Sequence, residues 1–269
     1  MFKFFQKIFN LKKPSGSTCS LPDGIDYHCH ILPGVDDGFQ DPEKSLEQLR
    51  IYEASGIREV WFTPHIMEDI PNEPEDLRRV FEDFKEKYLL DFAQRHPGSQ
   101  ASGAEGAKPS SATDEEPLQL HLAAENMMDT ILDERLESRD LLPLGSGLLV
   151  ETSFFSPPID MEGMLERVRS RGYFPVLAHP ERYGYMTDKE YENLKRQGVL
   201  FQLNLPSLTG FYGPGAQKKA EKFLKRGWYD LVGLDLHSYN ALKHILDSPV
   251  AEKTLALLGN LRGAEVIED

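Results

Sequence analysis

The alternation of strand-like and helix-like segments constrains the fold of this chain more than any other feature of its sequence. Seven short apolar segments are expected to be strands, at 23–28, 58–63, 118–124, 147–151, 173–178, 199–204 and 230–235. Helices are expected at 41–55, 74–94, 126–138, 160–171, 188–197, 214–226 and 239–258. Repeated β–α units imply a parallel sheet, and seven units in 269 residues favour an α/β, TIM-like (β/α)7 barrel over an open sheet.

Two segments fall outside this alternation. Residues 1–22 join a basic amphipathic stretch, 1–13, to a Pro/Gly/Ser-rich linker. We expect the stretch to pack on the domain, and the alternative is that it rests on an anionic membrane surface. Residues 97–117 are rich in Gly, Ala, Ser and acidic side chains and lack large apolar ones, which predicts a disordered insertion. The remainder, 23–269, is expected to form one domain.

Composition excludes several classes of protein. The net charge is −14, from 30 Lys and Arg against 44 Asp and Glu, which argues against a nucleic-acid binder. No apolar run approaches the roughly 20 residues that span a bilayer, and no signal peptide is present. Two cysteines, Cys19 and Cys29, are too few for a disulfide scaffold. A reduced, cytoplasmic protein is therefore expected.

Metal-binding side chains gather at the predicted carboxyl ends of the strands, which is where active sites form in α/β barrels. Each strand but the sixth ends near His, Asp or Glu, whose nitrogen and oxygen atoms suit Zn, Mn or Fe. The positions are His28, His30, His65, Glu125, Glu151, His179, Asp235 and His237. Side chains alternate along a strand, so each H-x-H or D-x-H pair can share one ion. Either pair alone is weak evidence, but the combination predicts a metal centre.

Six motifs support a family resemblance. In order along 25–240 they are I-D-Y-H-C-H-I-L-P-G-V-D-D-G (25–38), T-P-H (63–65), A-A-E (123–125), L-V-E (149–151), L-A-H-P-E-R-Y (177–183) and L-D-L-H (234–237). This set resembles the PHP (polymerase and histidinol phosphatase) metal-dependent phosphoesterases. It is most similar to their bacterial branch of capsule and exopolysaccharide tyrosine phosphatases. The resemblance implies a distorted PHP-type barrel with three divalent metals, usually manganese, with iron or zinc as other options.

The resemblance also implies which residues hold each metal. The three sets are His28, His30, Glu125 and Asp235; then Asp37, His65 and His237; then Glu125, Glu151 and His179. Asp37 enters only through the resemblance, because Asp36-Asp37-Gly38 alone is typical of a turn. Glu151 alone would be interpreted as a surface carboxylate at a strand end.

The residues expected to act on the substrate are Arg182, Asp37 and His237. Arg182 lies three residues after His179, where its guanidinium could bind a phosphoryl group through two hydrogen bonds. Without the resemblance, an ordinary salt bridge would be the preferred interpretation of Arg182. Many members of this branch have basic residues after T-x-H and an Arg after D-x-H, whereas this chain has Glu68-Asp69 and no Arg in 238–242. Fewer cations would lower phosphate affinity or change the substrate.

The expected reaction is hydrolysis of phosphotyrosine by metal-activated water. A cysteine nucleophile is excluded, because Gly34-Val35 stand where a Cys-x5-Arg loop needs its Arg after Cys29. The expected partner is a membrane-bound tyrosine autokinase that drives polysaccharide export, reached from the cytoplasmic face of the membrane. Two alternatives remain open. One is a phosphatase of small molecules such as histidinol phosphate or a sugar phosphate, and the other is a metal-binding module without turnover.

Overall fold

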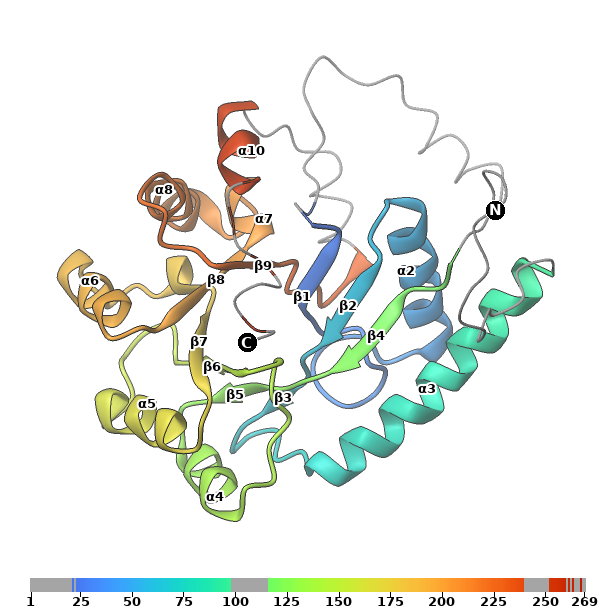
Figure 1. The fold of residues 1–269 in the computed structure, drawn as a ribbon, viewed down its shortest axis with the longest axis horizontal. Helices are drawn as coiled ribbons and strands as arrows, with labels where there is room; N and C mark the ends of the chain where they lie inside the picture. Colours follow the sequence, from blue (N-terminus) through green and yellow to red (C-terminus); the bar gives the residue numbers. More distant parts are fainter. Residues whose placement is uncertain are drawn as a thin grey trace, which may run out of the picture.

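The computed structural model describes residues 21, 23–97, 116–239, 252–259, 261, 263 and 267. The predictions made for 1–20, for 98–115 and for the first part of the last helix, 240–251, lie outside these residues. The described residues form a mixed α/β fold in which parallel strands lie at the centre and helices surround them (Figure 1). No helix among them is long and apolar enough to cross a membrane.

All paired strands are parallel, as the β–α alternation predicts. The smaller sheet has the order β1 (Ile25–Cys29), β2 (Glu59–Phe62) and β4 (Gln119–Leu122). The larger sheet has the order β3 (His65–Ile66), β5 (Glu125–Met127), β6 (Gly147–Glu151), β7 (Phe174–Ala178), β8 (Leu200–Asn204) and β9 (Leu231–Gly233). Within each sheet, the strands follow the order of the sequence. The crossover connection between neighbouring parallel strands contains a helix.

The main helices lie outside the strands (Figure 1). They are α2 (Pro42–Ala54), α3 (Pro74–Arg95), α4 (Thr130–Ser138), α5 (Met161–Ser170), α6 (Asp188–Arg196), α8 (Gly213–Lys225) and α10 (Glu252–Leu258). Two short helical turns were not predicted, η1 (Pro180–Arg182) and α7 (Leu205–Leu208). Both follow strands directly and are shorter than the window in which apolar periodicity is visible.

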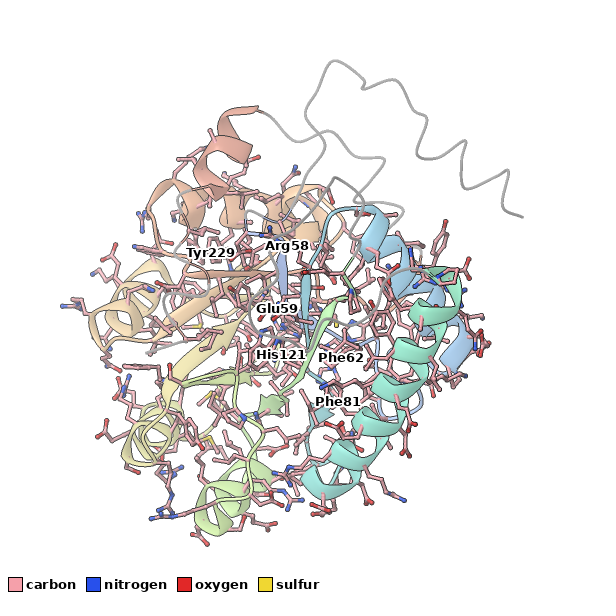
Figure 2. All side chains as sticks on the ribbon, turned by 45° about the vertical axis from the view of Figure 1, so that its right-hand side comes forward. Arg58, Glu59, Phe62, Phe81, His121 and Tyr229 are labelled. Atoms are coloured by element: carbon pink, nitrogen blue, oxygen red, sulfur yellow. The ribbon has the colours of Figure 1, made fainter. Side chains whose placement is uncertain are left out.

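Helix α3 shows how sequence and packing agree. Its buried side chains include Leu77, Phe81 and Phe84, which recur at helical spacing. The Phe81 ring meets Phe62 of β2 edge-on, with centroids 5.7 Å apart (Figure 2). Burial of one such aromatic side chain stabilises the fold by about 1.5–3 kcal/mol. The apolar face of α3 therefore holds this helix against the smaller sheet.

Two predicted strands are each followed at once by a short strand of the larger sheet that was not predicted. The segment 58–63 contains β2 alone, and β3 follows after Pro64, which has no N–H to donate to a ladder. The segment 118–124 contains β4 alone, β5 begins at Glu125, and backbone bonds connect β2 and β3 to β4 and β5. Ala123 N donates to Phe62 O at 2.8 Å, and Glu125 N donates to Pro64 O at 3.1 Å. The segment with β2 and β3 and the segment with β4 and β5 therefore stay hydrogen-bonded to each other where both pass from the smaller sheet to the larger one.

The prediction of a helix from residue 126 is wrong by four residues. Asn126 and Met127 belong to β5, and α4 begins at Thr130. The side chain of Asp129 caps that helix by accepting from Ile131 N at 2.9 Å. The Asn126 amide is occupied elsewhere, since it donates to the carbonyl oxygens of Ala124 and Leu149.

The outermost strands of the two sheets, β1 and β9, also lie side by side (Figure 1). Asp235 N donates to His28 O at 2.7 Å, and His30 N donates to Leu236 O at 3.2 Å. Tyr27 of β1 and Leu231 of β9 belong to one cluster of buried apolar residues together with Leu149 of β6. The first and last strands of the fold therefore meet at their carboxyl ends, where the predicted ligands lie.

Candidate metal centre

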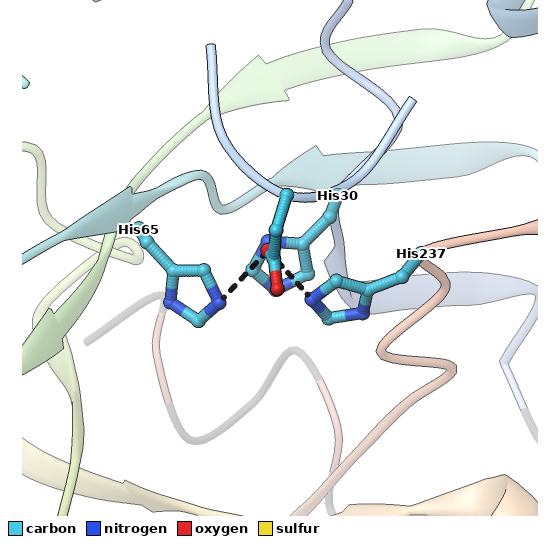
Figure 3. A group of neighbouring side chains, drawn as sticks. His30, His65 and His237 are labelled. Atoms are coloured by element: carbon cyan, nitrogen blue, oxygen red, sulfur yellow. Dashed lines mark ion pairs between the residues drawn. The ribbon is translucent and has the colours of Figure 1, made fainter. Parts of the chain in front are cut away.

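All nine predicted metal ligands lie together at the carboxyl ends of the strands. They lie on or just after β1, β3, β5, β6, β7 and β9: His28 on β1, His30 and Asp37 after it, His65 on β3, Glu125 on β5, Glu151 on β6, His179 directly after β7, and Asp235 and His237 on the segment after β9. Figure 3 shows His30, His65 and His237 converging from separate elements. The structure thus brings residues 209 positions apart in sequence, His28 and His237, into one site.

Glu125 lies at the centre of this site and is fully buried. Its Oε2 atom lies 3.2 Å from His28 Nε2, 3.3 Å from His30 Nε2 and 3.2 Å from His65 Nδ1. Its Oε1 atom lies 2.8 Å from His179 Nε2. One carboxylate therefore faces four imidazoles, which is an arrangement suited to a ligand that bridges cations.

Two other carboxylates extend the site. Asp235 Oδ1 lies 3.5 Å from His28 Nε2, 3.4 Å from His30 Nε2 and 3.3 Å from His237 Nδ1. Asp37 Oδ1 lies 3.3 Å from Nε2, the other ring nitrogen of His237. The Asp37 side chain is 64% exposed whereas that of Asp235 is 1% exposed, so Asp37 marks the open side of the site.

Three groups of these side chains have ligand atoms within 4.8 Å of one another. They are His28, His30, Glu125 and Asp235; His30, Asp37, His65 and His237; and His65, Glu125 and Glu151. The first group equals the set that the family resemblance implies. The second gains His30. In the third, His65 stands where His179 was expected, and His179 adjoins this group through Glu125.

The donor atoms of the site fit divalent cations. Among the predicted ligands, five buried atoms have no hydrogen-bond partner in the part of the chain that is described: Glu125 Oε2, Glu151 Oε1, Asp235 Oδ1, His65 Nδ1 and His179 Nδ1. An unsatisfied buried carboxylate oxygen is costly, and a bound cation removes that cost. Nitrogen and carboxylate donors in such groups are those that Zn, Mn and Fe accept.

Proton affinities in the site indicate the same need for positive charge. Burial alone would raise the pKa of the Asp235 carboxyl, but His28, His237 and Arg182 hold it well below its usual value. Burial would likewise lower the pKa of His28, yet Glu125 and Asp235 raise it to about 9. Protons on the imidazoles thus neutralise the carboxylates, and a metal that takes the same position must displace them.

Three further polar residues orient the ligands. His30 Nδ1 pairs with Asp36 Oδ2 at 2.7 Å, and His28 Nδ1 pairs with Gln202 Oε1 at 2.9 Å. Asn204 Nδ2 donates to Asp235 Oδ2 at 2.6 Å. Each bond engages the atom that faces away from the centre and so fixes the direction of the other. Sequence analysis missed these roles, although Asp36 lies in the D-D-G motif and Gln202 and Asn204 alternate on β8.

The backbone is strained at two of the ligands. His179 has a φ of 32° and Asp235 a φ of 48°, both in the left-handed region that residues other than glycine rarely adopt. Each residue directly follows or lies just beyond a strand, where the chain turns its side chain toward the centre. Strain of this kind costs of order 1–3 kcal/mol and tends to occur at functional sites.

Arg182, on η1, lies beside the metal-binding groups. Its Nη1 donates to Asp235 Oδ2 at 2.6 Å. The guanidinium carbon lies 4.3 Å from the centroid of the Phe154 ring and 4.2 Å from that of Tyr212. Phe154 and Tyr212 were not predicted as site residues. Both interpretations of Arg182 remain compatible with this geometry, because one bond to Asp235 uses only one of five N–H donors.

Two further histidines lie outside the site. The His121 ring stacks on Trp61 at 4.5 Å between centroids, and its Nε2 lies 3.3 Å from Glu59 Oε1 (Figure 2). His96 neighbours Arg95 at the end of α3. His244 lies outside the described residues.

Comparison with protein families decides the relationship that the motifs suggested. A family model described as capsular polysaccharide synthesis, CpsB/CapC, matches residues 24–251. The chain belongs to this family. The match spans every residue of the metal-binding groups, from His28 to His237. The capsule-associated branch predicted from the sequence is thereby confirmed.

Curated members of the CpsB/CapC family include tyrosine phosphatases. The tyrosine-protein phosphatase YwqE of Bacillus subtilis is 26% identical over 221 residues, which are 80% of this chain and 77% of YwqE. The tyrosine-protein phosphatase CpsB of Streptococcus pneumoniae is 25% identical over 227 residues, 81% of this chain and 84% of CpsB.

A solved structure confirms the relationship of the fold. It is described among crystal structures of YwqE from Bacillus subtilis and CpsB from Streptococcus pneumoniae, unique metal-dependent tyrosine phosphatases. The similarity has a TM-score of 0.69 at 25% identity and covers 90% of this chain and 89% of the solved chain. The mixed α/β arrangement with parallel strands is therefore shared with this CpsB/CapC structure.

Proposed function

We propose that this CpsB/CapC-family chain is a metal-dependent protein-tyrosine phosphatase. The observation that carries the proposal is the set of buried carboxylate and imidazole atoms without hydrogen-bond partners among the described residues, gathered within reach of three cations. Relatives named as tyrosine phosphatases, and a similar structure described as metal-dependent, support the same reaction.

Three divalent ions, manganese first and iron or zinc as alternatives, would be held by the nine side chains. His28, His30, Glu125 and Asp235 would hold one ion; Asp37, His65 and His237 a second; Glu125, Glu151 and His179 a third, with His30 and His65 near enough to contribute to the last two. Bound divalent ions supply a nucleophilic hydroxide at neutral pH and neutralise charge on phosphoryl oxygens. Glu125, which faces four imidazoles, would bridge the ions.

Residues on the open side of the site would handle the substrate. The side chains of Asp37 and His237 are 64% and 29% exposed, so a substrate meets them first. Arg182 would bind the phosphoryl oxygens through its remaining N–H groups. Its contacts with Asp235 and with the rings of Phe154 and Tyr212 would fix the orientation of the guanidinium plane. A water would protonate the leaving oxygen, because His237 as a metal ligand gives up the proton that its bond to Asp37 favours in the metal-free site. Tyrosine needs little further help, because its phenol has a pKa near 10.

A metal-coupled assay tests the proposal. The purified protein is stripped with a chelator, and Mn²⁺, Fe²⁺ and Zn²⁺ are returned separately while hydrolysis of p-nitrophenyl phosphate, a phosphotyrosyl peptide and histidinol phosphate is followed. We expect activity to vanish on stripping, to return best with Mn²⁺, and to favour the phosphotyrosyl peptide. Activity that survives complete metal removal would refute the proposal. A preference for histidinol phosphate would instead indicate a small-molecule phosphatase.

We further propose that the physiological substrate is a membrane tyrosine autokinase of polysaccharide export, met at the cytoplasmic face of the membrane. Residues 1–13, with Phe and Ile side chains between lysines, would associate with anionic lipid as one segment with the linker up to residue 22. Deletion of 1–20 should lower the fraction of protein that sediments with anionic vesicles and leave peptide hydrolysis intact. Unchanged sedimentation would reject the membrane contact.

Finally, we propose that the two sheets form one distorted seven-stranded barrel of the PHP type. Counting β2 with β3 and β4 with β5 as single divided strands gives seven positions in the ring. The backbone bonds from Asp235 to His28 and from His30 to Leu236 support closure between the first and last positions.

A further inference from the structure

Three exposed large apolar side chains lie on two loops beside the candidate metal centre. On the loop between β6 and α5, Phe155 is 90% exposed and Ile159 is 106% exposed. On the loop before α8, Phe211 is 39% exposed. Both loops follow the carboxyl ends of strands that surround the site. Exposed apolar side chains that gather beside a site are typical of an interaction surface.

These side chains continue directly from the group that would bind phosphate. Phe155 follows Phe154, whose ring covers one face of the Arg182 guanidinium. Phe211 contacts Tyr212, the ring on the other face of that guanidinium, with centroids 5.0 Å apart. Exposed apolar residues therefore neighbour in sequence both rings that contact Arg182, and we call Phe155, Ile159 and Phe211 the apolar rim.

The loop that holds Phe155 and Ile159 is fixed at both ends. Gly184 N donates to Phe154 O at 3.1 Å, so the start of the loop is tied to the segment after Arg182. At the other end, Asp160 caps α5 by accepting from Gly163 N at 3.2 Å. Pro157 and Pro158 stiffen the chain between these points. A loop held in this way pays little ordering entropy when it binds a partner.

We propose that the apolar rim docks apolar residues next to the phosphotyrosine of a polypeptide substrate. This inference rests on the proposed phosphatase function and deepens it. Phe155 and Ile159 are four residues apart, at most about 14 Å of extended chain, which matches a few residues of a peptide on one side of the phosphotyrosine. A small phosphate ester bound at Arg182 lacks the length to cover both. The rim therefore selects a protein substrate by its flanking sequence.

Acidic residues that follow another strand of the site make the flank preference distinct. Glu68 and Asp69, just after β3, are exposed. They would disfavour acidic residues in a bound peptide without attracting apolar ones. Test peptides must therefore be uncharged in the flanks, so that only contact with the apolar rim differs between them.

The test compares two phosphotyrosyl peptides that are identical except for their flanks, with Leu, Ile and Val in one and Ser, Thr and Gly in the other. For the metal-loaded protein, we expect kcat/KM to be about tenfold higher for the apolar peptide. In the double variant Phe155→Ser, Ile159→Ser, this ratio should fall toward one. The matched control replaces two exposed leucines of α3 far from the mouth, Leu89→Ser and Leu90→Ser, and should keep the ratio of the unmodified protein.

Two failures are distinguishable. Equal kcat/KM for both peptides in the unmodified protein, or an unchanged ratio in the Phe155/Ile159 variant, would overturn the docking proposal while leaving the phosphatase function in place. No hydrolysis of either peptide or of free phosphotyrosine would overturn the proposed function and the docking proposal with it.

Discussion

At the scale of single residues, the orientation of the proposed metal ligands depends on side chains that are not ligands themselves. Asp36 Oδ2 pairs with His30 Nδ1 at 2.7 Å and accepts from His65 N at 3.2 Å. Asp36→Asn keeps the size of the side chain but removes the charge that orients His30, so we expect metal affinity to fall by about 10–100-fold. Metal retained after dialysis against graded chelator measures this. Asp41→Asn, at the exposed cap of α2, is the control, and equal retention in both variants would contradict the role of Asp36.

Glu181 offers a residue-scale test of pH dependence. Burial raises its pKa to about 7, although bonds from Asn204 N and Tyr229 Oη favour the carboxylate. The folded protein thus keeps a proton that the unfolded chain loses above its ordinary pKa of 4.5. Glu181 therefore stabilises the fold below that pH, and the stability is lost as the pH rises toward 7.

The neutral variant Glu181→Gln lacks this titration. Between pH 4.5 and 7, the unfolding free energy of the unmodified protein should fall relative to the variant by about 3 kcal/mol. Urea unfolding of both proteins at several pH values, in chelator so that metal binding does not contribute, measures the difference. Parallel pH profiles would show that Glu181 does not titrate in this range.

The sequence predicts which charged side chains gather at the candidate site better than it predicts their surroundings. Ligand residue types stand at strand ends, a one-dimensional pattern, so eight of the nine positions follow from the strand assignment and Asp37 from the family motif. Phe154, Tyr212 and Gln202 were missed, because their roles depend on which loops and strands meet in space. Nothing in a local pattern shows that Tyr212 will lie 4.2 Å from the Arg182 guanidinium.

At the scale of elements, the contact between β1 and β9 leaves no room for a side chain at Gly233. A Cβ there would lie 2.4 Å from His28 Cβ and 2.8 Å from Gln202 Nε2. Gly233→Ala should push β9 away from β1, cost about 1–3 kcal/mol of stability and weaken metal retention by displacing Asp235. Thermal unfolding and metal analysis measure both effects.

Gly215→Ala is the matched control, because nothing lies within 4 Å of a Cβ at that position in α8. It should unfold at or slightly above the temperature of the unmodified protein, since Ala favours a helix over Gly. If both alanine variants retain metal equally, close packing of β9 on β1 is not what positions Asp235.

The elements themselves were predicted where periodicity is long. Helix α3 repeats its apolar residues over 22 positions, and its start was predicted correctly and its end to within one residue, whereas β3 has two residues and was missed. The end of the predicted strand 58–63 follows from Pro64, whose effect on the ladder is local. Which sheet the chain joins after Pro64 is set by its tertiary neighbours, chiefly Glu125, which no pattern in the sequence identifies.

At the scale of the whole molecule, this acidic chain would have a region of positive charge at the candidate metal centre only when divalent ions are bound there. The net charge is −14, and four of the 44 acidic residues are the proposed ligands Asp37, Glu125, Glu151 and Asp235. Net charge thus excludes a nucleic-acid surface without excluding an anionic substrate, because bound divalent ions reverse the local sign at the mouth.

Filling the site should also stabilise the whole fold, since its ligands come from strands throughout the sequence. Mn²⁺ that binds only the folded protein adds about 2.7 kcal/mol at 100 times its dissociation constant, roughly 5–10 °C in Tm for a chain of this size. Differential scanning calorimetry of the stripped protein with increasing Mn²⁺ measures the shift. Glu125→Gln, which alters the carboxylate shared by two of the groups, should abolish most of it, whereas Glu68→Gln at the exposed edge should not. A full shift in Glu125→Gln would mean that Mn²⁺ stabilises the protein from somewhere other than this centre.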